Sequence, residues 1–222
     1  MTSENLALTY QEVFTAIERL RSGRQAVADA NTFRQQVREA LSAAENDSRK
    51  LGYAPEEIRL STFALVAFLD ESILNLQNPV FQDWARKPLQ EEYFGGHNAG
   101  EIFFNNLQRL MTQNDSPTLA DVLEVYQLCI LLGYGGRYSL GARGELQSVR
   151  DGVDQRIRRI RGPRGDLSPA WKPMPAGARA ASDPWLRPLT IAAMVCACLA
   201  LVAFLTYKVL LNSGVSGLTR GD

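Results

Sequence analysis

An uncharged segment of nineteen residues near the C-terminus, Leu189 to Tyr207, constrains the fold of this chain more than any other feature. A helix rises about 1.5 Å per residue, so a segment of this length spans roughly the 30 Å hydrocarbon core of a bilayer. A buried helix of a soluble protein is the alternative, but such helices rarely contain so long a run without a charge. We therefore predict a transmembrane helix over residues 188–211, with Trp185, Leu189, Tyr207 and Lys208 as the membrane anchor.

The charges are divided along the chain although the formal net charge is zero. Residues 1–155 contain 14 Lys and Arg against 21 Asp and Glu, whereas residues 156–187 contain 8 against 2. Lys208 and Arg220 are the only basic residues after the apolar segment. Basic residues gather on the cytoplasmic side of a membrane helix, so the N-terminal part is predicted to be cytoplasmic. The first ten residues lack the basic and apolar regions of a signal peptide, so insertion is predicted to use the C-terminal helix itself.

These patterns predict the organisation of the whole chain. The predicted parts are a cytoplasmic domain over residues 1–162, a basic Pro/Gly/Ala-rich linker over 163–187, the transmembrane helix over 188–211 and a short periplasmic tail over 212–222.

The predicted fold class is all-α, because apolar residues in the N-terminal domain recur three and four positions apart and no useful alternating strand pattern occurs. Ser116 and Pro117 have the residue types of an N-cap and a first helical position. In the segment from Gly100 to Met111, the residues Ile102, Phe103, Leu107 and Leu110 are expected to face inward. Helices are predicted near residues 10–20, 33–44, 55–76, 100–111, 117–131 and 145–161.

The segment STFALVAFLDESIL, residues 61–74, is apolar on every side from Phe63 to Leu69 and then contains Asp70 and Glu71. This segment predicts the central, most buried helix of the domain. A carboxylate among apolar neighbours must be paired, hydrogen-bonded or open to a cleft. Two interpretations follow. The pair is satisfied internally by Arg137, Arg143 or a backbone amide, or it lines an acidic groove that receives a basic or amide-rich segment of a partner.

A glycine-rich loop from Gly133 to Gly144 follows the fifth predicted helix. It lacks the spacing of a Walker motif and follows no strand, so tight turns are favoured over phosphate binding. Arg137 is expected to pair with an acidic neighbour. The residues predicted to shape the groove or form ion pairs in this loop are Gly133, Gly136, Arg137, Tyr138 and Arg143.

No catalytic, cofactor-binding or metal-binding residues are predicted. The single histidine, His97, has no nucleophile or metal partner at a recognisable spacing. Cys129, Cys196 and Cys198 lie in apolar helical patterns and are expected to be packing residues. The arginine-rich segment 156–165 has no interleaved aromatic residues, so contact with anionic lipid is favoured over nucleic-acid binding.

Several stretches, taken in order, resemble the DotU/TssL (IcmH-like) family of type VI secretion systems and its type IV counterpart. They are FALVAFLDESIL, WARKPLQEEYF, GEIFFNNLQRL, LEVYQLCILLGYGGRYSL and GELQSVRDGV, followed by the C-terminal apolar segment.

The resemblance implies a hook of two helical bundles held to the bacterial inner membrane by one span. It implies a scaffold without catalytic activity, without a small-molecule substrate and without nucleic acid. The implied partners are an IcmF/TssM-type membrane protein, baseplate components, the lipid bilayer and a second copy of the chain. The family's acidic pair maps onto Asp70 and Glu71, which favours the partner-groove interpretation. The alternatives are a type IV DotU-like subunit and a nucleotide-regulated switch that uses the loop from Gly133 to Gly144.

Overall fold

The computed structural model of this chain describes residues 5–139, 141 and 143–162, together with six isolated C-terminal residues. The chain divides into two units, residues 1–165 and 166–222. The six isolated residues are helical and exposed, and they are Ile191, Met194, Val195, Leu199, Phe204 and Thr206. The predicted anchor residues Trp185, Leu189, Tyr207 and Lys208 lie outside the described residues, as do Cys196, Cys198 and the predicted linker and tail.

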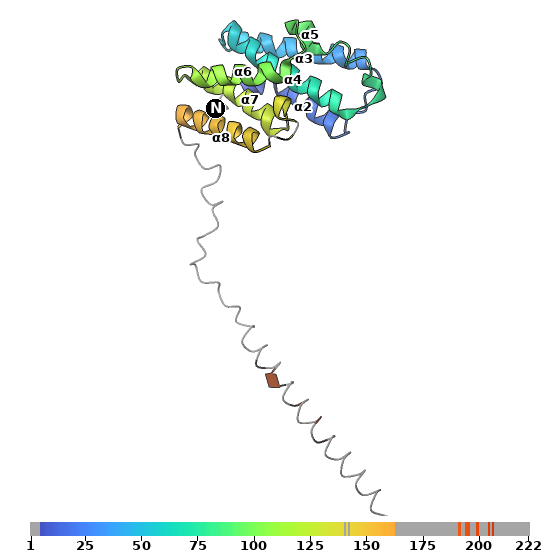
Figure 1. Cartoon of the computed structure of the whole chain (residues 1–222), viewed down its shortest axis with the longest axis vertical. Helices are drawn as coiled ribbons and strands as arrows, with labels where there is room; N and C mark the ends of the chain where they lie inside the picture. Colours follow the sequence, from blue (N-terminus) through green and yellow to red (C-terminus); the bar gives the residue numbers. More distant parts are fainter. Residues whose placement is uncertain are drawn as a thin grey trace, which may run out of the picture. The chain divides into compact units, whose positions relative to one another are not determined.

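The described part of residues 1–165 is all helical, with no strand among these residues, which confirms the predicted fold class (Figure 1). The helices are α1 (Leu6–Thr9), α2 (Gln11–Arg21), α3 (Ala30–Lys50), α4 (Pro55–Leu76), α5 (Leu89–Phe94), α6 (Ala99–Thr112), α7 (Pro117–Leu131) and α8 (Arg143–Arg161), with the short 3-10 helices η1 (Pro79–Phe81) and η2 (Gly136–Tyr138).

The helices begin where the sequence supplies capping groups. The Ser116 side chain accepts a hydrogen bond from the Leu119 amide, and the Asp29 side chain accepts one from the Thr32 amide. At the start of α4, Pro55 is the first helical residue and Glu57 accepts a hydrogen bond from the Ala54 amide. Two of these helix starts, at Ser116–Pro117 and at Pro55, were predicted from the sequence.

Helix α4 is the central helix of this unit, as predicted. It contacts α2, α3, α5, α6 and α7, and its residues from Leu60 to Asp70 are all buried. It runs parallel to α7, because the Tyr126 hydroxyl donates to the Leu60 carbonyl and the Cys129 thiol donates to the Ala64 carbonyl one turn further on. Cys129 is fully buried in this interface, which confirms it as a packing residue.

Helix α6 corrects one prediction about the core. Ile102 was expected to face inward, but it is 38% exposed, whereas Phe103 and Phe104 are both buried. The reason is the aromatic packing on the other side of the helix, where Phe104 lies 4.7 Å from the Tyr138 ring and Phe103 lies 4.4 Å from the Tyr134 ring. The buried face of α6 is therefore rotated towards the glycine-rich loop.

The segment Pro117–Tyr138, which contains α7, is by length and composition apolar enough to cross a membrane. More than half of its most apolar window is buried inside this unit, as expected for the core helix of a folded domain.

The arginines at the end of α8 are paired with carboxylates of the same unit. Arg156 and Arg159 both contact Asp115 in the connection between α6 and α7. Arg161 contacts Asp121 and Glu124 on α7. These pairs hold α8 against α7 and the connection before it. The same arginines were expected from the sequence to face a lipid surface, but here they are neutralised by carboxylates of the helical unit.

We predict that Leu65→Ala lowers the free energy of unfolding by about 2–5 kcal/mol, because it leaves a cavity at the centre of α4. Leu65 is fully buried, whereas Leu74 on the same helix is 46% exposed. Leu74→Ala is therefore the matched control, expected to change the free energy by less than about 1 kcal/mol. Chemical denaturation of the two variants measures both values. Equal losses would show that α4 is not the core helix.

Candidate functional site

The Asp70 carboxylate is a buried hydrogen-bond acceptor that joins α4 to the connection before α6. Its side chain is 1% exposed. It accepts from Trp84 Nε1 at 2.7 Å, from the Leu89 amide at 3.0 Å and from the Gln90 amide at 2.7 Å. Leu89 and Gln90 are the first residues of α5, whose own N-cap residue, Pro88, makes no side-chain hydrogen bond. Asp70 therefore caps α5 from a different helix.

Burial raises the pKa of the Asp70 carboxyl, and the three N–H donors act in the opposite direction. The donors therefore compensate in part for the loss of water around the carboxylate, since burial has the larger effect and the pKa stays raised. Arg34 on α3 closes the outer side of this arrangement, since its guanidinium lies 4.0 Å from the centre of the Trp84 ring and donates to the Lys87 carbonyl at 2.7 Å.

The Glu71 carboxylate holds a different connection. Its two oxygens accept from the Gly135 amide at 2.8 Å and from the Gly136 amide at 2.7 Å. Successive backbone amides that point into one concavity form a nest for an anion. The anion that fills this nest is Glu71, so the two loop amides that a phosphate would need are already hydrogen-bonded. This geometry disfavours the nucleotide-regulated alternative.

The glycine-rich loop approaches α6 too closely for a side chain at Gly136. Gly136 has φ of 47°, and a Cβ atom there would lie 2.9 Å from Phe104 Cε2 and 3.1 Å from the Gly100 carbonyl oxygen. A Cβ on Gly100 would in turn lie 3.3 Å from the Gly136 carbonyl carbon. Gly133 also has a positive φ, 105°, and faces the Arg21 guanidinium. Gly133 and Gly136 therefore fix the path of the loop, Gly136 against α6 and Gly133 beside the Arg21 side chain.

Arg137 pairs with an acidic neighbour, as expected, but the neighbour is Glu101 on α6 at 3.4 Å. Its guanidinium also lies 5.0 Å from the Tyr138 ring and 5.4 Å from the Phe104 ring. Arg137 does not contact the carboxylates of Asp70 or Glu71. Arg143 is the first residue of α8, and its side chain lies outside the described structure.

The predicted site residues therefore form two internal hydrogen-bonded assemblies. Of the two interpretations drawn from the sequence, the geometry corresponds to internal satisfaction by backbone amides. Asp70 is enclosed, whereas Glu71 is half-buried beside Gly135 and Gly136 of the glycine-rich loop. A role for the pair in partner binding stays a prediction, and in this geometry it acts through the connections that the two side chains position.

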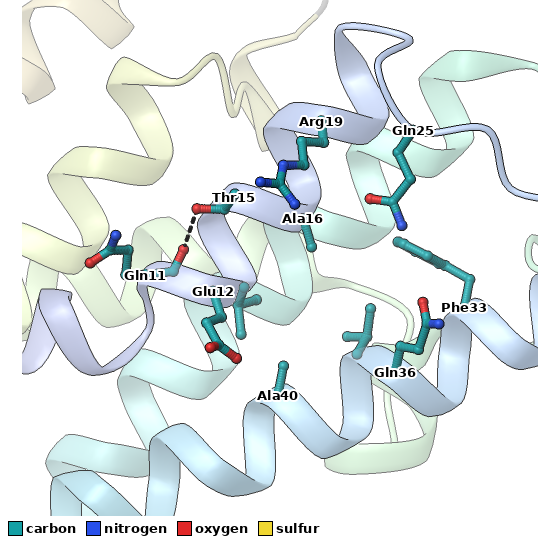
Figure 2. Close-up of a pocket in the computed structure, with 11 residues that line it drawn as sticks. Gln11, Glu12, Thr15, Ala16, Arg19, Gln25, Phe33, Gln36 and Ala40 are labelled. Carbon is teal, nitrogen blue, oxygen red and sulfur yellow. Dashed lines mark hydrogen bonds between the residues drawn. The ribbon is translucent and has the colours of Figure 1, made fainter.

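Two surface grooves were not predicted. The first lies between α2 and α3, has a volume of about 400 Å³ and contains Glu12, Arg19 and Gln36 among its lining residues (Figure 2). The second, of about 440 Å³, lies between α6, η2 and α8 and includes Met111 and Tyr138. The lining positions 12, 15, 16 and 19 and 33, 36, 37 and 40 share one face of each helix, but they mix polar and apolar residue types and therefore gave no sequence signal for a groove.

Among the described residues, no group of three or more His, Cys, Asp or Glu is arranged to hold a metal ion. The exposed His97 side chain lies 3.8 Å from the Glu91 carboxylate, in the turn before α6.

Known proteins provide an independent comparison. The family described as "Type VI secretion system protein DotU" matches residues 5–210. No curated protein matches the sequence. The solved cytoplasmic domain of TssL from Acinetobacter baumannii is 28% identical, with a TM-score of 0.66, over 71% of this chain and 99% of that chain.

Two further structures are similar at lower identity, which shows the shared fold alone. SciP/TssL from enteroaggregative Escherichia coli 042 is 22% identical, with a TM-score of 0.60, over 77% of this chain and 96% of that chain. DotU from Francisella novicida is 15% identical, with a TM-score of 0.60, over 70% of this chain and 99% of that chain.

We predict that Asp70→Asn lowers the free energy of unfolding by about 1.5–3 kcal/mol, because an amide accepts fewer of the three hydrogen bonds and lacks the charge that strengthens them. Asp83→Asn is the matched control, since the Asp83 side chain is 91% exposed, and a change within about 0.5 kcal/mol is expected there. Urea denaturation measures both. A loss at Asp70 no larger than at Asp83 would contradict the capping role.

We also predict that Gly136→Ala destabilises the chain by more than about 1 kcal/mol, because the residue has a positive φ and the new methyl group meets Phe104. Gly96→Ala is the control, because Gly96 has no positive φ and a Cβ atom added there would have no neighbouring atom within 4 Å. Thermal unfolding of the two variants compares them. A Gly136→Ala protein as stable as Gly96→Ala would show that the close approach to α6 relaxes at little cost.

Proposed function

This chain belongs to the type VI secretion system protein DotU family, and from that premise we propose that it is a structural subunit of the inner-membrane complex of a type VI secretion system. The single observation that carries the proposal is the extent of the family match. It spans residues 5–210 and so includes both the helical unit and the uncharged segment from Leu189 to Tyr207.

In this proposal the helical unit is cytoplasmic and the segment over residues 188–211 anchors the chain in the bacterial inner membrane. The excess of basic over acidic residues at positions 156–187 supports this orientation. The similarity to a TssL cytoplasmic domain, which covers 71% of this chain, supports the assignment of the helical unit to the cytoplasm. Residues 212–222 would then lie in the periplasm.

The chain would bind an IcmF/TssM-type membrane protein, dock baseplate components and associate with a second copy of itself. It would do so as a scaffold and not as an enzyme. The hydrogen bonds of Asp70 and Glu71 support a scaffold, because they hold α5 and the glycine-rich loop in place. Both carboxylates are therefore proposed as positioning residues for surfaces that partners contact.

The test is purification of the tagged full-length chain from its native membrane after crosslinking. We expect an IcmF/TssM-type protein and baseplate components to co-purify. Recovery of neither, from a folded and membrane-inserted chain, would overturn the proposed function.

The positioning role has its own prediction. Glu71→Gln replaces one accepting oxygen with an NH₂ group that faces a loop amide, so the loop loosens and partner recovery falls. The control is Ile157→Val on α8, which lies in the core and is expected to lower the free energy of unfolding by about 0.5–1.5 kcal/mol. A fall in recovery that is the same for both variants would mean that Glu71 acts through stability alone.

A further inference from the structure

The groove between α2 and α3 is long enough to hold a short stretch of helix. Its α2 side is formed by Glu12, Thr15, Ala16 and Arg19, which are spaced so that they lie on one face of the helix. On the α3 side, residues 33, 36, 37 and 40 repeat the same spacing. Seven residues of helix extend about 10.5 Å, so the groove accommodates about two turns of an occupant.

The base of the groove is apolar, and each of the two helices contributes a small side chain to its lining. Val13, Phe33 and Val37 are buried at its base, and Ala16 and Ala40 line it from the two helices (Figure 2). Small residues on both walls let the backbone of an occupant approach closely. Val13, Phe33 and Val37 are almost completely buried, so Ala16 and Ala40 are the apolar surface that an occupant would reach. Such a surface suits an amphipathic helix that packs closely.

The rim carries polar side chains that have no hydrogen-bond or ion-pair partner among the described residues. These are the side chains of Gln11, Glu12, Arg19, Gln25 and Gln36. The outer face of α3 differs, because Arg38, Arg49 and Lys50 each pair with a carboxylate. Glu12 and Arg19 are therefore charges in the groove that no other described side chain neutralises.

The charges of the rim are ordered. Glu12 lies at the end of the groove near Ala40 (Figure 2). Arg19 is seven residues further along α2, and its guanidinium is directed back towards Thr15 (Figure 2). Complementary charges on an occupant would be a basic residue opposite Glu12 and an acidic residue opposite Arg19, about seven positions apart. A helix also satisfies its own backbone groups, which an extended peptide in this groove could not do because no strand edge lines it.

We propose that the α2–α3 groove binds an amphipathic helix of a partner subunit of the secretion apparatus, one that carries a basic and an acidic residue seven positions apart beside its apolar face. This inference rests on the proposed function for the identity of the apparatus. The chemistry proposed for the occupant is inferred only from the residues that line the groove.

The first experiment places a photocrosslinking amino acid at Gln36, inside the groove, in the full-length chain in its native membrane. The matched control places it at Gln35, which neighbours Gln36 on α3 and does not line the groove. We expect a Gln36-specific adduct, and mass spectrometry should locate it in a helix of a secretion-apparatus subunit with the stated pair of charges. An adduct with lipid, with a second copy of this chain or with a segment that lacks these charges would overturn the proposal, as would no adduct beyond that at Gln35.

The second experiment uses a synthetic peptide of the crosslinked segment and the full-length chain in detergent. Glu12→Arg should weaken peptide binding at least about tenfold, because it places like charges opposite each other. Glu145→Arg is the control, since Glu145 is exposed in the first turn of α8, far from the groove in sequence. The double exchange Glu12→Arg with Arg19→Glu should restore binding of a peptide in which the two charges are interchanged.

Equal weakening of peptide binding by Glu12→Arg and Glu145→Arg would overturn the proposed order of charges. So would a failure of the double exchange to restore binding in a chain with wild-type circular dichroism.

The two proposals fail in different ways. If the IcmF/TssM-type protein still co-purifies but no Gln36-specific adduct forms, the groove inference is wrong and the proposed function stands. If no secretion component co-purifies at all, the proposed function is wrong.

Discussion

The hydrogen bonds of the Asp70 carboxylate are the interaction on which the arrangement of the helices around α4 depends. A buried carboxylate in an apolar helix loses its water on folding, and only well-placed donors offset that loss. Here the donors are the Trp84 indole and the first two amides of α5. The same contact therefore solvates the charge and caps a helix of only six residues that has no side-chain cap of its own.

The capping continues from one element to the next. The amide of Gln90 donates to Asp70, and the side-chain oxygen of Gln90 accepts from the Ala99 amide at the start of α6. Adjacent positions on a helix point about 100° apart, so Glu71 faces elsewhere and accepts from the glycine-rich loop. Two neighbouring residues of α4 thus hold two connections that are separate in sequence, which explains why a buried helix contains consecutive carboxylates.

Local rules predicted the elements well because their signals lie within a few residues of each other. Ser116 and Pro117 begin α7, and Pro55 begins α4, as their residue types indicate. The orientation of α6 could not be obtained in this way, because the aromatic partners that bury Phe104 and leave Ile102 exposed come from the loop 30 or more residues later. The partners of Asp70 were equally hidden, since backbone amides have no sequence signature. The residue types indicated only that some donor was required.

The end of α8 shows how charge that resembles a membrane-facing patch can serve the fold. Arg161 contacts Asp121 and Glu124, the Tyr53 hydroxyl donates to Asp121 and the Asn5 side chain donates to Glu124. One network therefore joins the N-cap of α1, the connection before α4, helix α7 and the last residue of α8. Because its members come from four elements, the network fixes the end of α8 to the rest of the helical unit.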